Sequence, residues 1–256
     1  MCVMLFAPLI GLLAGIIGSM FGLGGGFLVV PLLNIAGVDM KIAIGTSVTA
    51  IFFNAVSATV AYARYGYVIY KVGALVSATA IPSAYLGAIL TKYLDTNVLR
   101  CVFGMLLISV AFNVVIVKES ENGAQFSRMR WTLKTYFTLL CGGILAGIAS
   151  GLFGIGGGVI NVPLLTHIGF TMQYAAAISS MAVALTSITS AFMHYTLGNV
   201  DLSLLTLLVP TLVVGARIGA AVAIKTSSSA LRKGFFIVLT VIALRMVLKG
   251  LGYQIP

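Results

Sequence analysis

The sequence predicts an all-α integral membrane protein built from two homologous halves. Of its 256 residues, 60% are hydrophobic and only 8% are charged, and the mean hydropathy is +1.14. A soluble domain carries about 25% charged residues, so these side chains are too few to cover a water-exposed surface. One glycine-rich motif occurs twice, once in each half. The composition therefore predicts membrane helices, and the repeat predicts a duplicated fold.

Uncharged segments mark the expected helices. In chain order they are 3–38, 42–63, 72–91, 101–117, 135–200, 202–216 and about 228–250. A helical crossing takes about 20 apolar residues, and helices satisfy the backbone hydrogen bonds that lipid cannot. The stretches 3–38 and about 135–170 are too long for one crossing and too short for two. Both are interrupted at the repeated motif.

The motif reads Phe-Gly-x-Gly-Gly-Gly and is followed by Pro-Leu-Leu, at 21–33 and again at 153–165. The second copy follows the first by 132 residues, and looser matches beyond it pair Ser47 with Ser180. We therefore expect a first membrane repeat over 1–117, a polar linker over 118–133 and a second membrane repeat over 134–256.

The glycine triplets predict a break in each long segment. Each glycine weakens a helix by about 1 kcal/mol, and non-helical backbone at membrane depth must line a cavity or be buried in protein. Each half is predicted to hold a glycine-broken re-entrant helix pair followed by three membrane helices. The spacings Gly11-x-x-x-Gly15 and Gly143-x-x-x-Gly147 are instead interpreted as close helix packing.

The distribution of Lys and Arg between the loops predicts the membrane topology. If each broken segment returns to its starting side, nine bases share one side and five the other, whereas full crossings give no usable bias. The larger group is Arg64, Lys71, Lys118, Arg128, Arg130, Lys134, Lys225, Arg232 and Lys233; the smaller is Lys41, Lys92, Arg100, Arg245 and Lys249. Because basic loops face the cytoplasm, this bias predicts an inverted repeat with both termini outside.

The doubled motif, in an apolar chain with a net charge of +10, resembles the TauE/SafE family of sulfite exporters. The resemblance covers nearly the whole chain. It implies a multi-pass protein of the bacterial inner membrane that exports small sulfur-containing anions, such as sulfite, sulfoacetate or related organosulfonates.

The motif itself predicts where an anion binds. A helix that restarts after a break presents free N–H groups and the positive end of its dipole, and glycine lets a ligand come close. Such a site needs no charged side chain. We expect the substrate to be held by the backbone of Gly24, Gly25, Gly26, Gly156, Gly157 and Gly158. Close helix packing is the alternative interpretation of these glycines.

Several side chains are further candidates for substrate contact: Asn161, Thr46, Ser47, Ser179, Ser180 and Arg217. The four hydroxyls are expected at the beginnings of helices, where they would act as caps or donate to the anion. Arg217 lies in an uncharged stretch, where a base is costly unless it is functional or snorkels to the interface. Asn54 is a secondary candidate.

Titratable groups are scarce in the apolar segments. All five acids lie at segment ends or in the linker, which argues against a carboxylate proton relay and a carboxylate-bound metal. His194 is interpreted either as a hydrogen-bonded structural residue or as a carrier of proton coupling. We expect no cofactor.

The pattern favours a secondary transporter that works by alternating access, and not an enzyme. A passive anion channel is the alternative. A non-transport membrane assembly protein or a membrane enzyme is a less favoured alternative. The expected partners are the small anionic substrate, membrane lipid and a second copy in a homodimer. Nucleic acid is excluded because no soluble domain carries a basic face.

Overall fold

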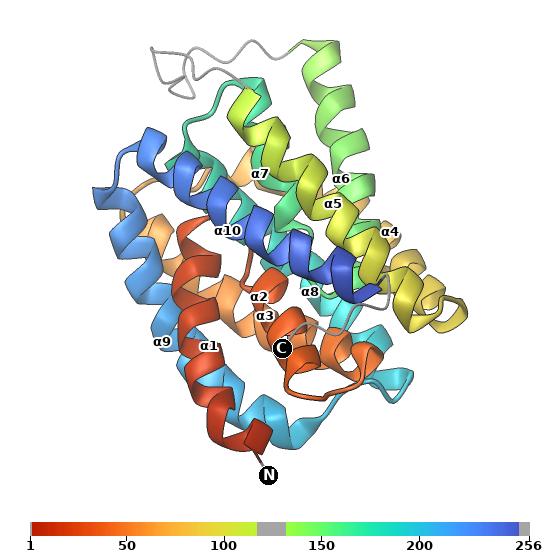
Figure 1. Cartoon of the computed structure of the whole chain (residues 1–256). Coiled ribbons are helices and arrows are strands. Elements are labelled where there is room, and N and C mark those ends of the chain that lie inside the picture. The colour runs from red at the N-terminus through yellow and green to blue at the C-terminus, as the bar shows by residue number, and fades with distance from the viewer. Residues whose placement is uncertain (1, 117–131, 251–256) are drawn as a thin grey trace.

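The computed structural model describes residues 2–116 and 132–250, and every regular element in these two stretches is a helix (Figure 1). In chain order the described helices are α1 (Cys2–Met20), α2 (Gly26–Ile35), α3 (Met40–Arg64), α4 (Tyr70–Tyr93), α5 (Thr96–Ile116), α6 (Leu133–Phe153), α7 (Gly158–Ile168), α8 (Met172–Thr196), α9 (Leu202–Lys225) and α10 (Ser228–Gly250). The predicted all-helical fold is confirmed. Residues 118–131 of the predicted linker lie outside the described residues.

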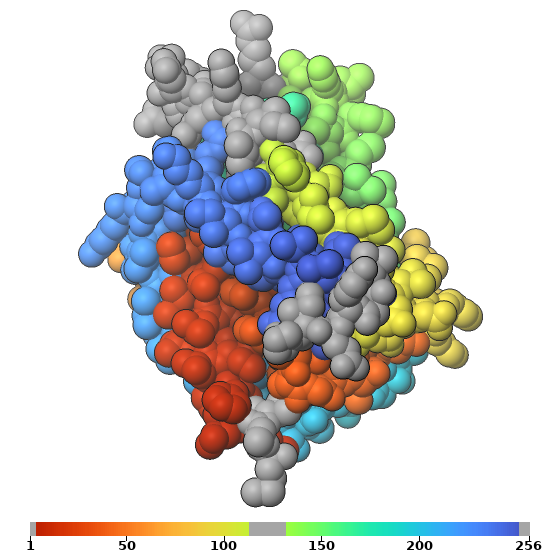
Figure 2. All heavy atoms as spheres, in the orientation of Figure 1, coloured from red at the N-terminus to blue at the C-terminus, as the bar shows by residue number. Residues whose placement is uncertain are grey.

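Five of the described helices, α3, α4, α6, α8 and α9, are long and apolar enough to cross a membrane. Large apolar side chains cover much of the outer surface; Leu5 is 79% exposed, Phe137 68% and Phe192 66%. Figure 2 shows one face of the molecule, on which α10 lies beside α5 and above α1. An outer surface of this kind is suited to lipid tails rather than to water.

Acidic residues mark the beginnings of two long helices. Asp39 precedes α3 and accepts a hydrogen bond from the Lys41 backbone N–H at 2.9 Å. Asp201 precedes α9 and accepts from the backbone N–H groups of Ser203 and Leu204 at 2.8 and 3.1 Å. These carboxylates satisfy N–H groups that a helix leaves without partners.

The two halves interlock. Helix α1 packs along α9, and its counterpart α6 packs along α4; α3 packs on α8, and α5 on α10. Exchanging the two halves therefore reproduces the same set of helix pairs, which is the pattern of a pseudo-twofold axis. The core of each half is completed by helices of the other.

Small residues allow these helix pairs to approach closely, as the sequence predicts. A methyl group on Gly15 would lie 2.6 Å from the Leu212 carbonyl oxygen of α9. On Gly147 it would overlap Ala80 of α4 in the same way. The packing interpretation of the two Gly-x-x-x-Gly pairs is confirmed.

Each short helix folds back along the helix before it. Gly25, just before α2, packs on the carbonyl of Ala14, whereas Leu32 and Ile35 near the end of α2 share a groove with Phe6 and Leu9. Helix α7 lies on α6 in the same manner. At 1.5 Å per residue, the 10 residues of α2 cover about 15 Å, half of a bilayer core.

The equivalent helices α3 and α8 run antiparallel. Gly45 near the beginning of α3 packs on Asn199, just after α8 ends. Tyr67, after the end of α3, contacts Tyr174 near the beginning of α8, with ring centroids 4.9 Å apart.

Candidate functional site

Positive φ angles break the chain at both glycine motifs. In the first copy φ is +69° at Gly22, +73° at Gly24 and +89° at Gly25. In the second copy Gly154, Gly156 and Gly157 have φ of +65°, +70° and +77°. A side chain with a Cβ rarely adopts this conformation, so these glycines end one helix and orient the next.

The two breaks meet at the centre of the molecule. A methyl group on Gly158 would lie 2.5 Å from the Gly22 carbonyl oxygen, and one on Gly26 would overlap the Gly154 carbonyl. Gly24 and Gly156 both pack against the same two side chains, Ile51 of α3 and Val183 of α8. The motifs, 132 residues apart in the chain, thus form one shared centre.

Backbone N–H groups without hydrogen bonds among the described residues lie at both breaks. Within the described residues, no hydrogen bond is made by the N–H groups of Gly24, Gly25, Gly26 and Phe27, at the beginning of α2. The same holds for those of Gly156, Gly157, Gly158 and Val159, at the beginning of α7. All eight residues are buried. Buried N–H groups without acceptors are costly, and their number here indicates a place that a ligand or water completes.

Carbonyl groups of the breaks are held by side chains of α3 and α8. Asn54 donates to the Gly24 carbonyl at 2.9 Å, and Thr186, its equivalent, to the Gly156 carbonyl at 3.2 Å. Ser179 donates to the Gly22 carbonyl at 2.6 Å, and Ser47 to that of Gly154 at 3.2 Å. The structure therefore pairs Ser47 with Ser179. The expected pairing with Ser180 is wrong by one residue, because the spacing of 132 continues into α3 and α8.

The four hydroxyls are not helix caps. Helix α3 begins after Asp39 and α8 after Thr171, so Thr46, Ser47, Ser179 and Ser180 lie farther along these helices. The cap interpretation is wrong because both helices begin earlier than the polar residues suggested. Thr46 accepts from the Asp201 backbone N–H at 2.9 Å, and Ser180 donates within its own helix, to Ala176 at 2.8 Å.

His194 is held in place by two hydrogen bonds. Its Nε2 lies 2.8 Å from the Gly151 carbonyl, which can only accept, so Nε2 carries the proton. Nδ1 lies 3.4 Å from the Asn199 side-chain amide, which donates to it. The equivalent residue of the first half is Tyr62, and its hydroxyl donates to the Ser19 carbonyl at 2.8 Å. This matched contact supports the structural interpretation of His194.

Arg217 is not brought to the glycine breaks. Its side chain is exposed on α9, beside the exposed Val214 and Ile218, whereas Gly215 and Gly219 face α1. This placement agrees with a guanidinium that snorkels from an outer helix face.

Three buried polar side chains near the breaks have atoms without a partner among the described residues. They are Asn54 through Oδ1, Asn161 through both amide atoms, and Ser187 through Oγ. None of the three has any exposed surface. Ser187 and Thr186 are not among the candidates that the sequence predicts. The sequence marks them only as two adjacent polar residues in the middle of an apolar segment. Thr186 follows Gly156 by 30 residues, and Ser187 is the next residue in the chain.

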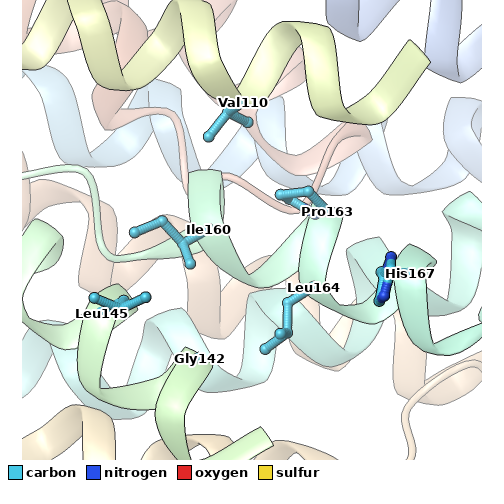
Figure 3. Close-up of a pocket in the computed structure, with 7 residues that line it drawn as sticks. All are labelled: Val110, Gly142, Leu145, Ile160, Pro163, Leu164 and His167. Atoms are coloured by element: carbon cyan, nitrogen blue, oxygen red, sulfur yellow. The ribbon is translucent and has the colours of Figure 1, made fainter. Parts of the chain in front are cut away.

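Apolar grooves lie beside the hairpins and apart from the breaks. One, of about 250 Å³, is lined by residues of α5, α6 and α7 (Figure 3): Val110, Gly142, Leu145, Ile160, Pro163, Leu164 and His167. A groove of about 430 Å³ occupies the corresponding place between α1 and α2. His167 alone brings a titratable group to the first groove, so neither groove offers the cluster of donors seen at the breaks.

Comparison with known proteins agrees with this architecture. Residues 7–246 match the family model described as sulfite exporter TauE/SafE. The chain is 29% identical to the probable membrane transporter protein MJ0441 of Methanocaldococcus jannaschii, covering 94% of both chains. It is 30% identical to the probable membrane transporter protein YunE of Bacillus subtilis, covering 94% of this chain and 96% of the relative. The chain is a multi-pass membrane transporter and belongs to the TauE/SafE sulfite exporter family.

Proposed function

We propose that this transporter exports small sulfur-containing anions, namely sulfite, sulfoacetate or related organosulfonates, across the bacterial inner membrane. The observation that carries the proposal is the meeting of two glycine breaks, whose buried N–H groups make no hydrogen bonds within the described residues. Oxygen atoms of sulfite and sulfonates are acceptors that such donors bind. The family description supports the substrate class.

Transport would follow alternating access around this centre. The antiparallel arrangement of α3 and α8 supports an inverted repeat, because equivalent helices would then cross the membrane in opposite directions. The folded-back α2 and α7 support re-entrant hairpins whose tips lie near the midplane. Movement of one half against the other would expose the centre to each side in turn.

Counterflow in proteoliposomes tests the substrate and the mechanism together. Vesicles preloaded with unlabelled sulfite should accumulate labelled sulfite transiently, and the rate should saturate with concentration. Sulfoacetate should compete. Uptake that does not saturate, with single-channel currents, would indicate a channel, and no uptake of any of these anions would contradict the substrate class.

Cysteine accessibility tests the orientation. Single cysteines placed in the linker between Lys118 and Lys134 should react with a membrane-impermeant reagent only from the cytoplasmic side. A reaction from the periplasmic side would reverse the topology and remove the charge argument for it.

A further inference from the structure

The two glycine breaks share a backbone but differ in the side chains around them. Beside the second break stand Ser187 and Asn161; the equivalent positions of the first half hold Ala55 and Val29. Both pairs are fully buried. The second break thus has side-chain donors at two positions where the first has methyl groups.

Ser187 faces the backbone at the beginning of α7. Its Oγ lies 3.2 Å from the point that a Cβ on Gly156 would occupy, and it makes no hydrogen bond within the described residues. The hydroxyl of Thr186, next to it, has acceptors within reach, among them the Ala182 carbonyl at 2.8 Å and the Gly156 carbonyl at 3.2 Å. The Ser187 hydroxyl is left available beside the free N–H groups of α7.

Asn161 lies one turn inside α7. It shares a helix face with Gly158, three residues earlier, which packs on Gly22 and Leu23 of the first motif. Both atoms of its buried amide are without a partner within the described residues. A buried side-chain amide normally has hydrogen-bond partners. Their lack at Asn161 therefore indicates that a bound ligand or water supplies them.

We propose that the transported anion binds at the beginning of α7, with the Ser187 hydroxyl and the Asn161 amide as its side-chain donors. The inference rests on the proposed function and assigns its site to one of the two breaks. The break before α2 then serves as a structural counterpart. Because Ser187 and Asn161 are neutral, the site is suited to one singly charged oxoanion group, such as hydrogen sulfite or the sulfonate group of an organosulfonate, which needs less charge compensation than a doubly charged group such as sulfate.

Exchanging residues between the halves tests the assignment. The variants Ser187→Ala and Asn161→Val install the side chains of the first half; Ala55→Ser and Val29→Asn are the matched controls. Binding of sulfite, sulfoacetate and sulfate to the purified full-length protein would be measured by calorimetry, with thermal unfolding as a check of folding. We expect each of the first two variants to weaken sulfite and sulfoacetate binding roughly tenfold or more, and the controls to bind as the unaltered protein does.

The outcomes separate the two proposals. If the unaltered protein binds sulfite and both Ser187→Ala and Asn161→Val retain full affinity while folded, the inference is overturned and the proposed function stands. Equal losses in Ala55→Ser and Ser187→Ala would also overturn it, because the site would then be shared by both breaks. If the unaltered protein binds neither sulfite nor sulfoacetate, the proposed function fails and the inference with it.

Discussion

In the two halves of the molecule, equivalent backbone carbonyls accept hydrogen bonds from side chains of different types. Tyr62 and His194 occupy equivalent positions and donate to equivalent carbonyls, those of Ser19 and Gly151, both at 2.8 Å. Asn54 and Thr186 likewise hold the carbonyls of the two breaks. Glycine, by contrast, occupies both copies of the triplet. The break geometry therefore requires glycine, whereas the side chain that stabilises the break can vary as long as it donates a hydrogen bond.

The largest effect is expected at the glycines themselves. In Gly25→Val and Gly157→Val the new Cβ would lie 2.7 Å from the Ala14 carbonyl oxygen and 2.6 Å from that of Ala146, in addition to the strain of positive φ. We expect the yield of folded protein to fall sharply in both variants. The controls Gly37→Val and Gly66→Val share positive φ but have nothing within 4 Å, so they should cost only about 1–2 kcal/mol.

Thermal unfolding and size-exclusion chromatography in detergent would measure all four variants. Equal losses in the two pairs would mean that backbone strain alone matters, and would contradict the close packing of the breaks.

A smaller loss is expected where a single buried hydrogen bond is removed. Tyr62→Phe and His194→Leu leave the carbonyls of Ser19 and Gly151 without their donors, at about 1–3 kcal/mol each. Apparent Tm values should fall by similar amounts in the two variants. A loss confined to His194→Leu would show that the two positions are not equivalent.

Exchanging the hydrogen-bond donors of the two halves should affect stability less than removing a donor does. Asn54→Thr and Thr186→Asn each install the residue with which the other half holds its break, so the carbonyls of Gly24 and Gly156 keep a donor. We expect each exchange to lower the free energy of unfolding by less than the loss of a buried hydrogen bond, which costs about 1–3 kcal/mol. Asn54→Leu and Thr186→Val, which remove the donor, serve as references; if the exchanges destabilise as much as these, donation is not what the two positions share.

The variant His194→Gln is expected to leave any coupling between transport and a proton gradient unchanged. Glutamine keeps a donor for the Gly151 carbonyl but does not titrate near neutral pH. If a pH gradient drives uptake, the variant should retain that dependence, because the proton then travels on the substrate. Loss of gradient-driven uptake in a folded variant would assign the coupling to His194.

Much of the architecture could be predicted from the sequence. The helix breaks followed from the triplets at 24–26 and 156–158, because consecutive glycines rarely continue a membrane helix. The packing of Gly15 and Gly147 followed from their spacing with Gly11 and Gly143. These features are local, so a short stretch of sequence contains them.

What the sequence did not predict depends on contacts between the halves. The packing of α4 on α6, and of α9 on α1, joins segments that no local pattern relates. Ser187 reads as an ordinary polar residue until α8 is placed beside Gly156. The hydroxyls of Thr46, Ser47, Ser179 and Ser180 do not cap helices, because α3 begins after Asp39 and α8 after Thr171, several residues before them.

Locating the anion directly is the sharpest test of whether the transporter binds its substrate where the two glycine breaks meet. A sulfonate that carries bromine, such as 2-bromoethanesulfonate, would be soaked into crystals of the full-length protein and located by anomalous diffraction. We expect a sulfonate group against the N–H groups of Gly156–Val159, beside Ser187. A sulfonate bound only elsewhere, in the apolar grooves or among the surface bases, would contradict this expectation.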